Sequence, residues 1–543
     1  MKKFKELIPS YVISFVLSFM MFIFEPITMY SSNVNDFWFD MYIMINPTLV
    51  AFLILFLGLS FGFTIIYFIS KRFTKNNIIY NIFVLLALIG FICMYIHGNY
   101  FAGGLPALDG ETIQWESYKT QNIISIIICL MACLGTGVFI KKFTISTVVK
   151  NSSYVVGAIF IMLSVSLFST LLTTNALEKK YGSVSATVKN INVASSDKNF
   201  FILLLDAVDS RVFNEVMISN NQYKDLLTDF TYYPDTLSAY PFTRDSIPFI
   251  LSGIWNENET DFAEYSTNAY NNSKLIQALK KDNYDLNIYD HEIIWNHENA
   301  ADISNLVANR DINYLSLIKQ EVKYFLFKYL PYPLKQFSSV NTLNFSLCKV
   351  AKDYDYFNWN DVNAYNTITK NKLELTNQKM FKFIHLEGGH VPFDLDENLN
   401  VIENGTYEQK VAASLKLIDA YLNRLKENNI YDDSVIIILA DHGYSLENVY
   451  QRFNPILYIK GINEHHKMET SNIPISYEDL NSAYLDLLEG KSSRDLFKNI
   501  DLKRTRRFIW YNYTAEYHMT EYNLKGKAWE FDKYIKTGKE FNR

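Results

Sequence analysis

Residues 200–206 read Phe-Phe-Ile-Leu-Leu-Leu-Asp, six consecutive apolar side chains that end in a carboxylate. Two later stretches share this design. Residues 381–386 lead into Glu387-Gly388-Gly389-His390, and residues 435–440 stop at Asp441-His442-Gly443. Apolar runs of this length are typical of strands that are buried on both faces of a parallel sheet. Because amphipathic helical stretches separate them, the sequence predicts an α/β domain.

The polar residues at the ends of the three runs can meet in space, because ligands bind at the carboxyl ends of parallel strands. Asp206, Asp441 and His442 would supply two carboxylates and an imidazole, a ligand set suited to a divalent cation. Taken alone, an aspartate after a strand is most often a helix N-cap. The convergence of the three strand ends is therefore the central prediction.

A nucleophile is predicted within residues 238–253, Ser-Ala-Tyr-Pro-Phe-Thr-Arg-Asp-Ser-Ile-Pro-Phe-Ile-Leu-Ser-Gly. Thr243 precedes an apolar helical stretch and could simply cap that helix. The same position places its oxygen beside backbone N–H groups at the positive end of the helix, where an anionic group is stabilised. A hydroxyl activated there by a cation would be a nucleophile.

The first third of the chain concentrates the apolar residues, although the mean hydropathy of the whole chain is only -0.02. A helix needs about 20 apolar residues to cross a bilayer core. Five segments qualify: residues 11–29, 47–69, 78–97, 123–140 and 154–172. The first is expected to be retained, since no small-residue cleavage site follows it. A hydrophobic bundle inside a soluble protein is the alternative interpretation.

Basic residues in the short loops predict the orientation of these spans, because Lys and Arg resist translocation. The loops after the second and fourth spans contain Lys71, Arg72, Lys75, Lys141, Lys142 and Lys150. The alternate loops are poor in basic residues and contain Asp36, Asp40, Asp109, Glu111 and Glu116. The N-terminus should therefore be cytoplasmic, and everything after about residue 173 should lie outside.

The overall composition excludes several classes of protein. A chain of 543 residues is too long for a single small binding module. A formal net charge of -6 argues against a nucleic-acid binder. Only four cysteines occur, Cys93, Cys129, Cys133 and Cys348, and the first three lie in apolar runs, so a disulfide framework is not expected.

The expected domain order is a transmembrane domain over residues 1–173, a connector over 174–198, a catalytic domain over 199–500 and a strand-rich tail over 501–543. Residues 315–337 mix lysines with aromatic residues, which suits either an interfacial helix or an ordinary surface helix. The tail alternates aromatic and polar residues after Lys503, as strands at a sheet edge do.

At these residues the chain resembles the alkaline phosphatase and sulfatase superfamily, and within it the membrane-anchored phosphoethanolamine transferases and lipoteichoic acid synthases. Thr243, Ser246 and Pro248 fit the Thr-x-x-Ser-x-Pro pattern of the transferases, and Gly253 stands ten residues after Thr243, as in sulfatases. Asp441-His442-Gly443 matches the Asp-His-Gly signature, and His390 matches a His-x-Pro-Phe element.

This resemblance implies a fold and a location. The fold would be an N-terminal five-helix transmembrane bundle followed by an α/β domain of the alkaline phosphatase and sulfatase type. The chain would cross a bacterial plasma membrane several times, with the catalytic domain extracytoplasmic. The expected partners are a phospholipid donor, a glycan or lipid acceptor and the membrane itself, and no nucleic acid.

The resemblance also implies a reaction, the metal-dependent transfer of phosphoethanolamine or phosphoglycerol from a phospholipid to a cell-envelope glycan or lipid through a phosphothreonine. Asp206, Thr243, Asp441 and His442 would hold one divalent cation, Zn or Mn/Mg. Thr243 and His390 would be catalytic, His390 by protonating the leaving alkoxide or by hydrogen bonding to a phosphoryl oxygen. Further candidates for substrate binding are Arg244, His465 and His466.

Several departures from the family pattern leave alternatives open. Asp206 replaces a glutamate of the closest transferases, and the second histidine that usually follows Asp-His-Gly is absent, so that His465 or His466 could substitute for it. A sulfatase-type ester hydrolase would need Cys or Ser in a Cys/Ser-x-Pro-x-Arg motif, and the stretch from Ser246 lacks the arginine. Cys348 also lies in an unsuitable context. A non-catalytic glycan-binding membrane protein is the other alternative.

Overall fold

The computed structural model describes the chain except for residues 1, 35–36, 38, 75–76, 102–112, 178–183, 224, 258–261, 292, 309–311, 339, 341–342, 347, 349–354, 446–451, 512–517 and 543. Asp36, Lys75, Asp109 and Glu111, which contributed to the predicted orientation of the spans, lie outside the described residues. Two compact units are present. The first comprises Met1–Lys180 and Arg310–Val350, and the second comprises Tyr181–Asn309 and Ala351–Arg543.

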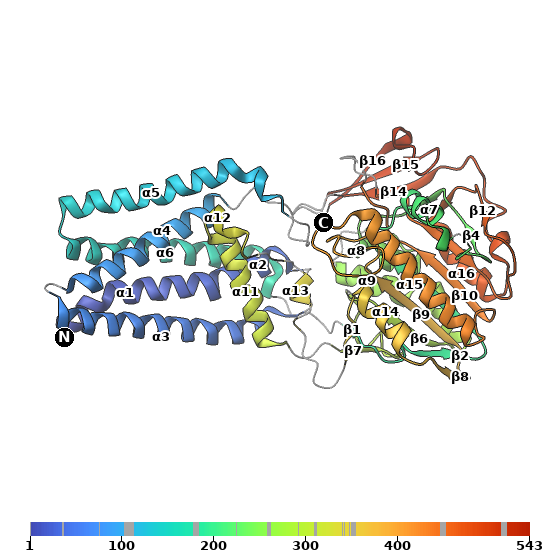
Figure 1. The fold of residues 1–543 in the computed structure, drawn as a ribbon, viewed down its shortest axis with the longest axis horizontal. Helices are drawn as coiled ribbons and strands as arrows, with labels where there is room; N and C mark the ends of the chain where they lie inside the picture. Colours follow the sequence, from blue (N-terminus) through green and yellow to red (C-terminus); the bar gives the residue numbers. More distant parts are fainter. Residues whose placement is uncertain are drawn as a thin grey trace. The chain divides into compact units, whose positions relative to one another are not determined.

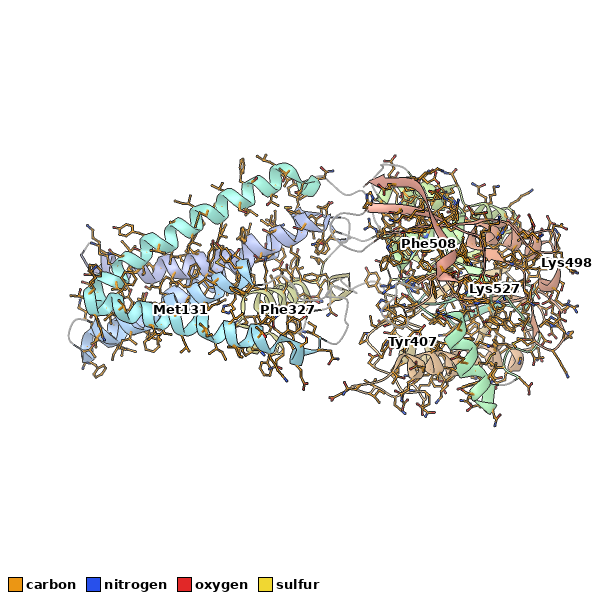
Figure 2. The ribbon with its side chains drawn as sticks, turned by 90° about the horizontal axis from the view of Figure 1, so that it is seen from above. Met131, Phe327, Tyr407, Lys498, Phe508 and Lys527 are labelled. Atoms are coloured by element: carbon orange, nitrogen blue, oxygen red, sulfur yellow. The ribbon has the colours of Figure 1, made fainter. Side chains whose placement is uncertain are left out.

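The first unit contains five helices that are long and apolar enough to cross a membrane, as predicted. They span Lys5–Ser32, Met41–Phe73, Ile78–Tyr100, Trp115–Lys142 and Ile145–Thr173. Their elements are α1 (Lys2–Phe19), the π-helical turn η1 (Met20–Phe24), α2 (Glu25–Ser32), α3 (Met41–Phe73), α4 (Ile78–Tyr100), α5 (Lys119–Lys142) and α6 (Ile145–Thr173). Large apolar side chains such as Met131 project outward from them (Figure 2), which suits an apolar solvent.

Residues 310–350 belong to this helical unit although they interrupt the sequence of the second unit. They form α11 (Tyr314–Tyr329), α12 (Tyr332–Lys335) and α13 (Leu343–Ser346). Helix α11 crosses the long helices at a steep angle (Figure 1) and packs on α3 and α4. The compact units therefore combine segments that are separated in the sequence, and α11 packs on the long helices of the first unit.

The second unit is built on a seven-stranded sheet whose strands lie in the order β12-β4-β11-β10-β3-β9-β6. Their bounds are β3 (Asn199–Leu205), β4 (Thr231–Tyr232), β6 (Asp285–Tyr289), β9 (Met380–Leu386), β10 (Ser434–Leu439), β11 (Leu457–Lys460) and β12 (Glu469–Thr470). Strands β6, β9, β3 and β10 are parallel neighbours, as expected. Strand β11 runs antiparallel to β10, so the sheet is mixed.

Helices cover both faces of this sheet. The ring of Phe200 meets Tyr484 of α16 (Leu480–Leu488), while the ring of Phe201 meets Tyr421 of α15 (Tyr407–Glu427). Successive residues of a strand point to opposite faces, so α15 and α16 lie on opposite sides of β3. Every residue of β3, β9 and β10 is buried, which explains why these strands are mostly apolar.

The remaining helices of this unit are α7 (Ser210–Ser219), α8 (Thr243–Ser252), α9 (Phe262–Asn271), α10 (Lys274–Lys281) and α14 (Asp361–Lys370). Helices α7 and α14 contact α15, whereas α8 and α10 contact α16, so each group extends one of the two layers. The C-terminal residues form a separate antiparallel sheet of β14 (Arg506–Trp510), β15 (His518–Leu524) and β16 (Tyr534–Asn542).

Three small two-stranded sheets complete the described part of this unit. They pair β1 (Val184–Ala186) with β7 (Leu306–Ala308), β2 (Val193–Ser195) with β8 (Glu374–Thr376), and β5 (Thr236–Leu237) with β13 (Ile475–Ser476).

Candidate metal centre

The strand register brings the predicted polar residues to one edge of the sheet. Leu204 of β3 lies opposite Leu439 of β10, and Leu205 lies opposite Leu386 of β9. Strands β3 and β10 therefore end side by side, and Asp206 and Asp441, which follow them, are neighbours. This is the convergence that the sequence predicted.

Asp206, Asp441 and His442 form a group whose ligand atoms all lie within 4.8 Å of one another. Nε2 of His442 is 3.2 Å from Oδ2 of Asp441 and 3.9 Å from Oδ1 of Asp206. All three side chains are buried. The residues that the sequence proposed as cation ligands are therefore close enough to share one ion.

The free atoms of this group face a common point. Nδ1 of His442 is 2.7 Å from the carbonyl oxygen of Gly443, which fixes its proton there and leaves the Nε2 lone pair toward the carboxylates. Among the described residues, Oδ1 of Asp206 and Oδ2 of Asp441 are buried and have no hydrogen-bond partner. Three lone-pair donors that face one another are stable only with a cation between them, so the residues fit a metal ion.

The hydroxyl of Thr243 belongs to the same site. Thr243 is the first residue of α8, and its Oγ1 donates a hydrogen bond of 3.3 Å to Oδ2 of Asp206. The first turn of α8 is held in place by Asp245, whose carboxylate accepts hydrogen bonds from Asn256 and Tyr511. A fixed helix thus presents the hydroxyl beside the candidate ligands, at the end of the helix that stabilises anions.

Two glycines of the Glu-Gly-Gly-His stretch let the backbone approach Asp206. Gly388 has a φ of 60°, and a Cβ there would lie 2.6 Å from the backbone N and O of Asp206. A Cβ on Gly389 would lie 2.6 Å from the ring of Tyr407. The Tyr407 hydroxyl donates a 2.7 Å hydrogen bond to the carbonyl of Ala207, which fixes the turn after β3.

Burial and mutual charge set the protonation of these groups. Burial alone would raise the pKa of Asp206, but the nearby imidazoles of His390, His385 and His442 keep that pKa below its usual value. Burial, followed by the charge of Asp206, raises the pKa of Asp441. Burial lowers the pKa of His442, which favours the neutral imidazole that a cation requires.

His390 stands near the group but is held by other contacts. Its Nδ1 is 2.5 Å from the carbonyl oxygen of Val391, and its ring lies 5.1 Å from the Trp359 ring. It is half-buried and contributes to the charge around Asp206. The structure thus places His390 at the same edge of the sheet, with Nε2 as the nitrogen that could serve a substrate.

The three candidates for substrate binding lie in two places. Arg244 follows Thr243 directly in α8. The guanidinium of Arg244 lies over the ring of Phe262, 4.2 Å from its centroid. His465 is 3.9 Å from Asp432, and the backbone N–H of His466 donates to Asp229. Asp432 precedes β10, so both histidines lie toward the start of that strand, whereas Asp441 follows its end.

The sequence left open whether His465 or His466 substitutes for the missing family histidine, and neither lies in the cation group. The physical reason is the direction of β11. Since β11 is antiparallel to β10, it carries the chain back to the opposite edge of the sheet before residues 461–468 begin.

Sequence reasoning missed two polar residues that the sheet adds to this edge. His385 is part of β9 and fully buried, with Nε2 3.3 Å from Oδ2 of Asp206 and Nδ1 2.8 Å from Oδ1 of Asp290. Asp290 follows β6 directly. A histidine inside a mostly apolar strand was the available signal, because a buried imidazole needs polar partners.

Asp361 was missed as well, and it supports the loop that leads to His390. Its carboxylate accepts hydrogen bonds from the backbone N–H groups of Glu387 and Gly388. Burial and the charge of Glu387 raise the pKa of Asp361 to about 7. No sequence signal marks this residue, because it lies at the start of α14, far along the chain.

The helix-covered sheet, with two aspartates, a histidine and a threonine hydroxyl at its carboxyl edge, fits the alkaline phosphatase and sulfatase superfamily. Its members act on phosphate or sulfate esters with the help of a metal ion. The Sulfatase family model matches residues 198–472, and the chain belongs to this family. No curated protein matches the chain.

Several solved structures are similar to the chain at low identity. Ps i-CgsB in complex with k-i-k-neocarrahexaose is 15% identical, with 60% of this chain and 82% of that chain covered and a TM-score of 0.39. A protein in the alkaline phosphatase superfamily from Vibrio parahaemolyticus is 13% identical, with 64% and 80% covered and a TM-score of 0.35. The soluble domain of lipooligosaccharide phosphoethanolamine transferase A from Neisseria meningitidis is 12% identical, with 56% and 91% covered and a TM-score of 0.31.

Proposed function

We propose that the chain transfers a phospho-headgroup, phosphoethanolamine or phosphoglycerol, from a membrane phospholipid to a hydroxyl of a cell-envelope glycan or lipid through a phosphothreonine. The observation that carries this proposal is the Thr243 hydroxyl, which donates to Asp206 beside the Asp206–Asp441–His442 group. A fixed hydroxyl next to a cation site is the arrangement of an activated nucleophile.

In the first proposed step, Oγ1 of Thr243 attacks the phosphorus of the phospholipid in line and passes its proton to Oδ2 of Asp206, its hydrogen-bond acceptor. The new O–P bond forms as the bond from phosphorus to the diacylglycerol oxygen breaks, and His390 protonates that leaving oxygen. A divalent cation held by Asp206, Asp441, His442 and Thr243, either Zn or Mn/Mg, would supply charge stabilisation.

In the second step, an acceptor hydroxyl attacks the phosphothreonine. The acceptor O–P bond forms as the bond to Thr243 breaks, and the Thr243 oxygen takes back the proton from Oδ2 of Asp206. His390, now deprotonated, takes the acceptor's proton. The protein thus returns to its starting state with the headgroup on the acceptor.

A lipid donor is consistent with the five apolar helices of the first unit, since the donor never leaves the bilayer. The proposed topology has a cytoplasmic N-terminus and an extracytoplasmic catalytic unit in a bacterial plasma membrane. A phospholipid donor, an envelope acceptor and the membrane would then be the partners.

A sulfatase-type hydrolase is the rival, and the position of Ser246 weighs against it. That chemistry needs a modified Cys or Ser as the nucleophile, and Ser246 is the only such residue in a partly matching motif. Its side chain is fully buried, and its hydroxyl donates to the carbonyl of Tyr240. A non-catalytic role would leave the unpartnered oxygens of Asp206 and Asp441 buried without a use.

The test is peptide mass spectrometry of the full chain in detergent, incubated separately with phosphatidylethanolamine and phosphatidylglycerol in the presence of Mn²⁺ or Zn²⁺. We expect added mass on the peptide that contains Thr243, and the mass identifies the transferred group. Thr243→Ala should abolish the adduct and turnover, a loss of at least about 1,000-fold, while the cation remains bound.

Ser246→Ala is the matched control, because it removes a hydroxyl from the same helix, one turn further on. This variant should keep the adduct. An adduct that persists in Thr243→Ala, or that disappears only in Ser246→Ala, would refute the proposed nucleophile.

A further inference from the structure

A second group of ligand-type side chains lies beside the first. Asp290 leaves the end of β6, and since Tyr289 is paired with Ile384 of β9, the register places Asp290 next to His385. Oδ1 of Asp290 is 2.8 Å from Nδ1 of His385 and 3.4 Å from Nδ1 of His291. The ligand atoms of all three residues lie within 4.8 Å of one another.

Nε2 of His385 has the hydrogen-bond acceptor that orients a metal-bound histidine. Histidines that bind a metal with one nitrogen usually donate the other N–H to a carboxylate or carbonyl, which sets the tautomer. Nε2 of His385 lies 3.3 Å from Oδ2 of Asp206. With the proton on Nε2, the Nδ1 lone pair is directed to the side where Asp290 and His291 lie.

The ring of His291 is also held in position. It stacks on the indole of Trp359, with the ring centroids 4.4 Å apart and the planes at 17°. Asp290 and His385 are 3% and 0% exposed. A buried and pre-positioned set of ligands loses little entropy when an ion binds.

The geometry matches that of the Asp206–Asp441–His442 group. There the imidazole nitrogen is 3.2 Å from one carboxylate oxygen and 3.9 Å from the other. In the second group the spacing is similar but joins one carboxylate oxygen to two imidazoles: Oδ1 of Asp290 is 2.8 Å from Nδ1 of His385 and 3.4 Å from Nδ1 of His291. Two ligands that each lie about 2 Å from one zinc ion are separated by about 3 Å, so both groups are ready to close around an ion.

Charge balance points the same way. Asp206, Asp290 and Asp441 are three buried carboxylates at one edge of the sheet. With neutral imidazoles, one divalent cation would leave a net negative charge in this buried region, and a second cation would offset it.

We propose that Asp290, His291 and His385 bind a second divalent cation, adjacent to the one at Asp206, Asp441 and His442. Two imidazoles and one carboxylate form a ligand set that favours zinc over magnesium or calcium. His385 would connect the two sites through its hydrogen bond to Asp206. The proposal goes beyond the transfer reaction and does not depend on which ester is the substrate.

The test is a metal count on the full chain in detergent, stripped with a chelator, reloaded with zinc and equilibrated at a buffered free zinc concentration that saturates both sites. Wild type should hold two zinc ions per chain. Asp290→Asn and His291→Gln should each hold one, whereas the control His465→Gln, which removes an exposed histidine at the other edge of the sheet, should hold two.

Zinc-edge X-ray absorption on wild type gives a readout that needs no variant. If both sites are occupied, three imidazoles bind two zinc ions. If only the first site is occupied, one imidazole binds one zinc ion. A wild-type protein with one zinc ion and one imidazole would overturn the proposal, as would a count of two that Asp290→Asn and His291→Gln leave unchanged. The metal count is independent of turnover, so a failed transfer assay does not bear on this result.

Discussion

The two carboxylate oxygens of Asp206 make different contacts. Oδ2 accepts hydrogen bonds from Thr243 and from His385, each at 3.3 Å, while Oδ1 has no such partner among the described residues. Both the nucleophile and the neighbouring histidine are therefore aligned through one side chain. The backbone of Asp206 must be held as firmly as its side chain, and Gly388 and Tyr407 provide that support.

Gly388→Ala should damage the site through the backbone. The new Cβ would clash with the backbone of Asp206 and the alanine would have a positive φ, so the variant should lose about 3 kcal/mol of stability and bind its cation weakly. Gly490→Ala is the control, because Gly490 also has a positive φ, 87°, but nothing lies within 4 Å of its Cβ position. That variant should lose about 1 kcal/mol and keep its cation.

Chemical unfolding gives the stability of both variants, and metal analysis gives their cation content. Equal losses of stability in the two would show that backbone strain alone, and not contact with Asp206, makes Gly388 important.

At the scale of the element, β9 combines structural and chemical roles. All seven residues are buried, yet the strand includes both Lys382 and His385. Nζ of Lys382 donates a 2.8 Å hydrogen bond to the carbonyl of Ile191. Burial, followed by the charge of Arg424, lowers the pKa of Lys382 to about 7. Folding therefore favours the neutral form of Lys382, which lies in the same strand as His385.

Lys382→Met should stabilise the protein at neutral pH. The folded pKa of about 7 lies below the unfolded value near 10.4, so the lysine destabilises the fold below pH 10, and the penalty grows until about pH 7. The gain from Lys382→Met should be at most about 4 kcal/mol at pH 7 and should vanish as the pH approaches 10.

Chemical unfolding at several pH values, compared as the difference between variant and wild type, tests this expectation. The comparison cancels the other titrating groups. A difference that is constant from pH 7 to 10 would mean that Lys382 stays charged in the fold.

At the scale of the whole molecule, the chain passes between its two compact units more than once. Residues 310–350 leave the second unit, pack on the apolar helices and return. The contact is polar as well as apolar. Nζ of Lys328 lies 2.8 Å from the carboxylate of Glu25, which is 1% exposed, and the Tyr329 hydroxyl donates to the same carboxylate at 2.5 Å. Gly98 of α4 leaves the room that the Tyr329 ring occupies.

Breaking this ion pair should destabilise the first unit. Glu25→Gln and Lys328→Met should each cost about 2 kcal/mol, because each leaves a charge without its partner, and the double variant should cost less than the sum. Thermal unfolding in detergent gives the coupling energy. Lys319→Met, at an exposed position of α11, is the control and should change little. Additive losses in the double variant would show that the two residues act independently.

The sequence by itself determined the five apolar helices, the α/β class of the second unit and the three strand ends that bear Asp206, His390 and the Asp441–His442 pair. These features are local, because a long apolar run or a buried strand that ends in a carboxylate depends only on consecutive residues. Thr243 was also predicted from its spacing to Pro248 and Gly253, and the structure places its hydroxyl beside Asp206.

Only the tertiary structure decided which distant segments meet at the carboxyl edge of the sheet and which belong to the same compact unit. The antiparallel direction of β11 moved His465 and His466 away from the group, and the pairing of β6 with β9 brought Asp290 to His385. The packing of α11 on α3 and α4 placed residues 310–350 in the first unit. Strand direction, register and helix docking depend on contacts between residues far apart in the chain, and a single sequence does not record those contacts.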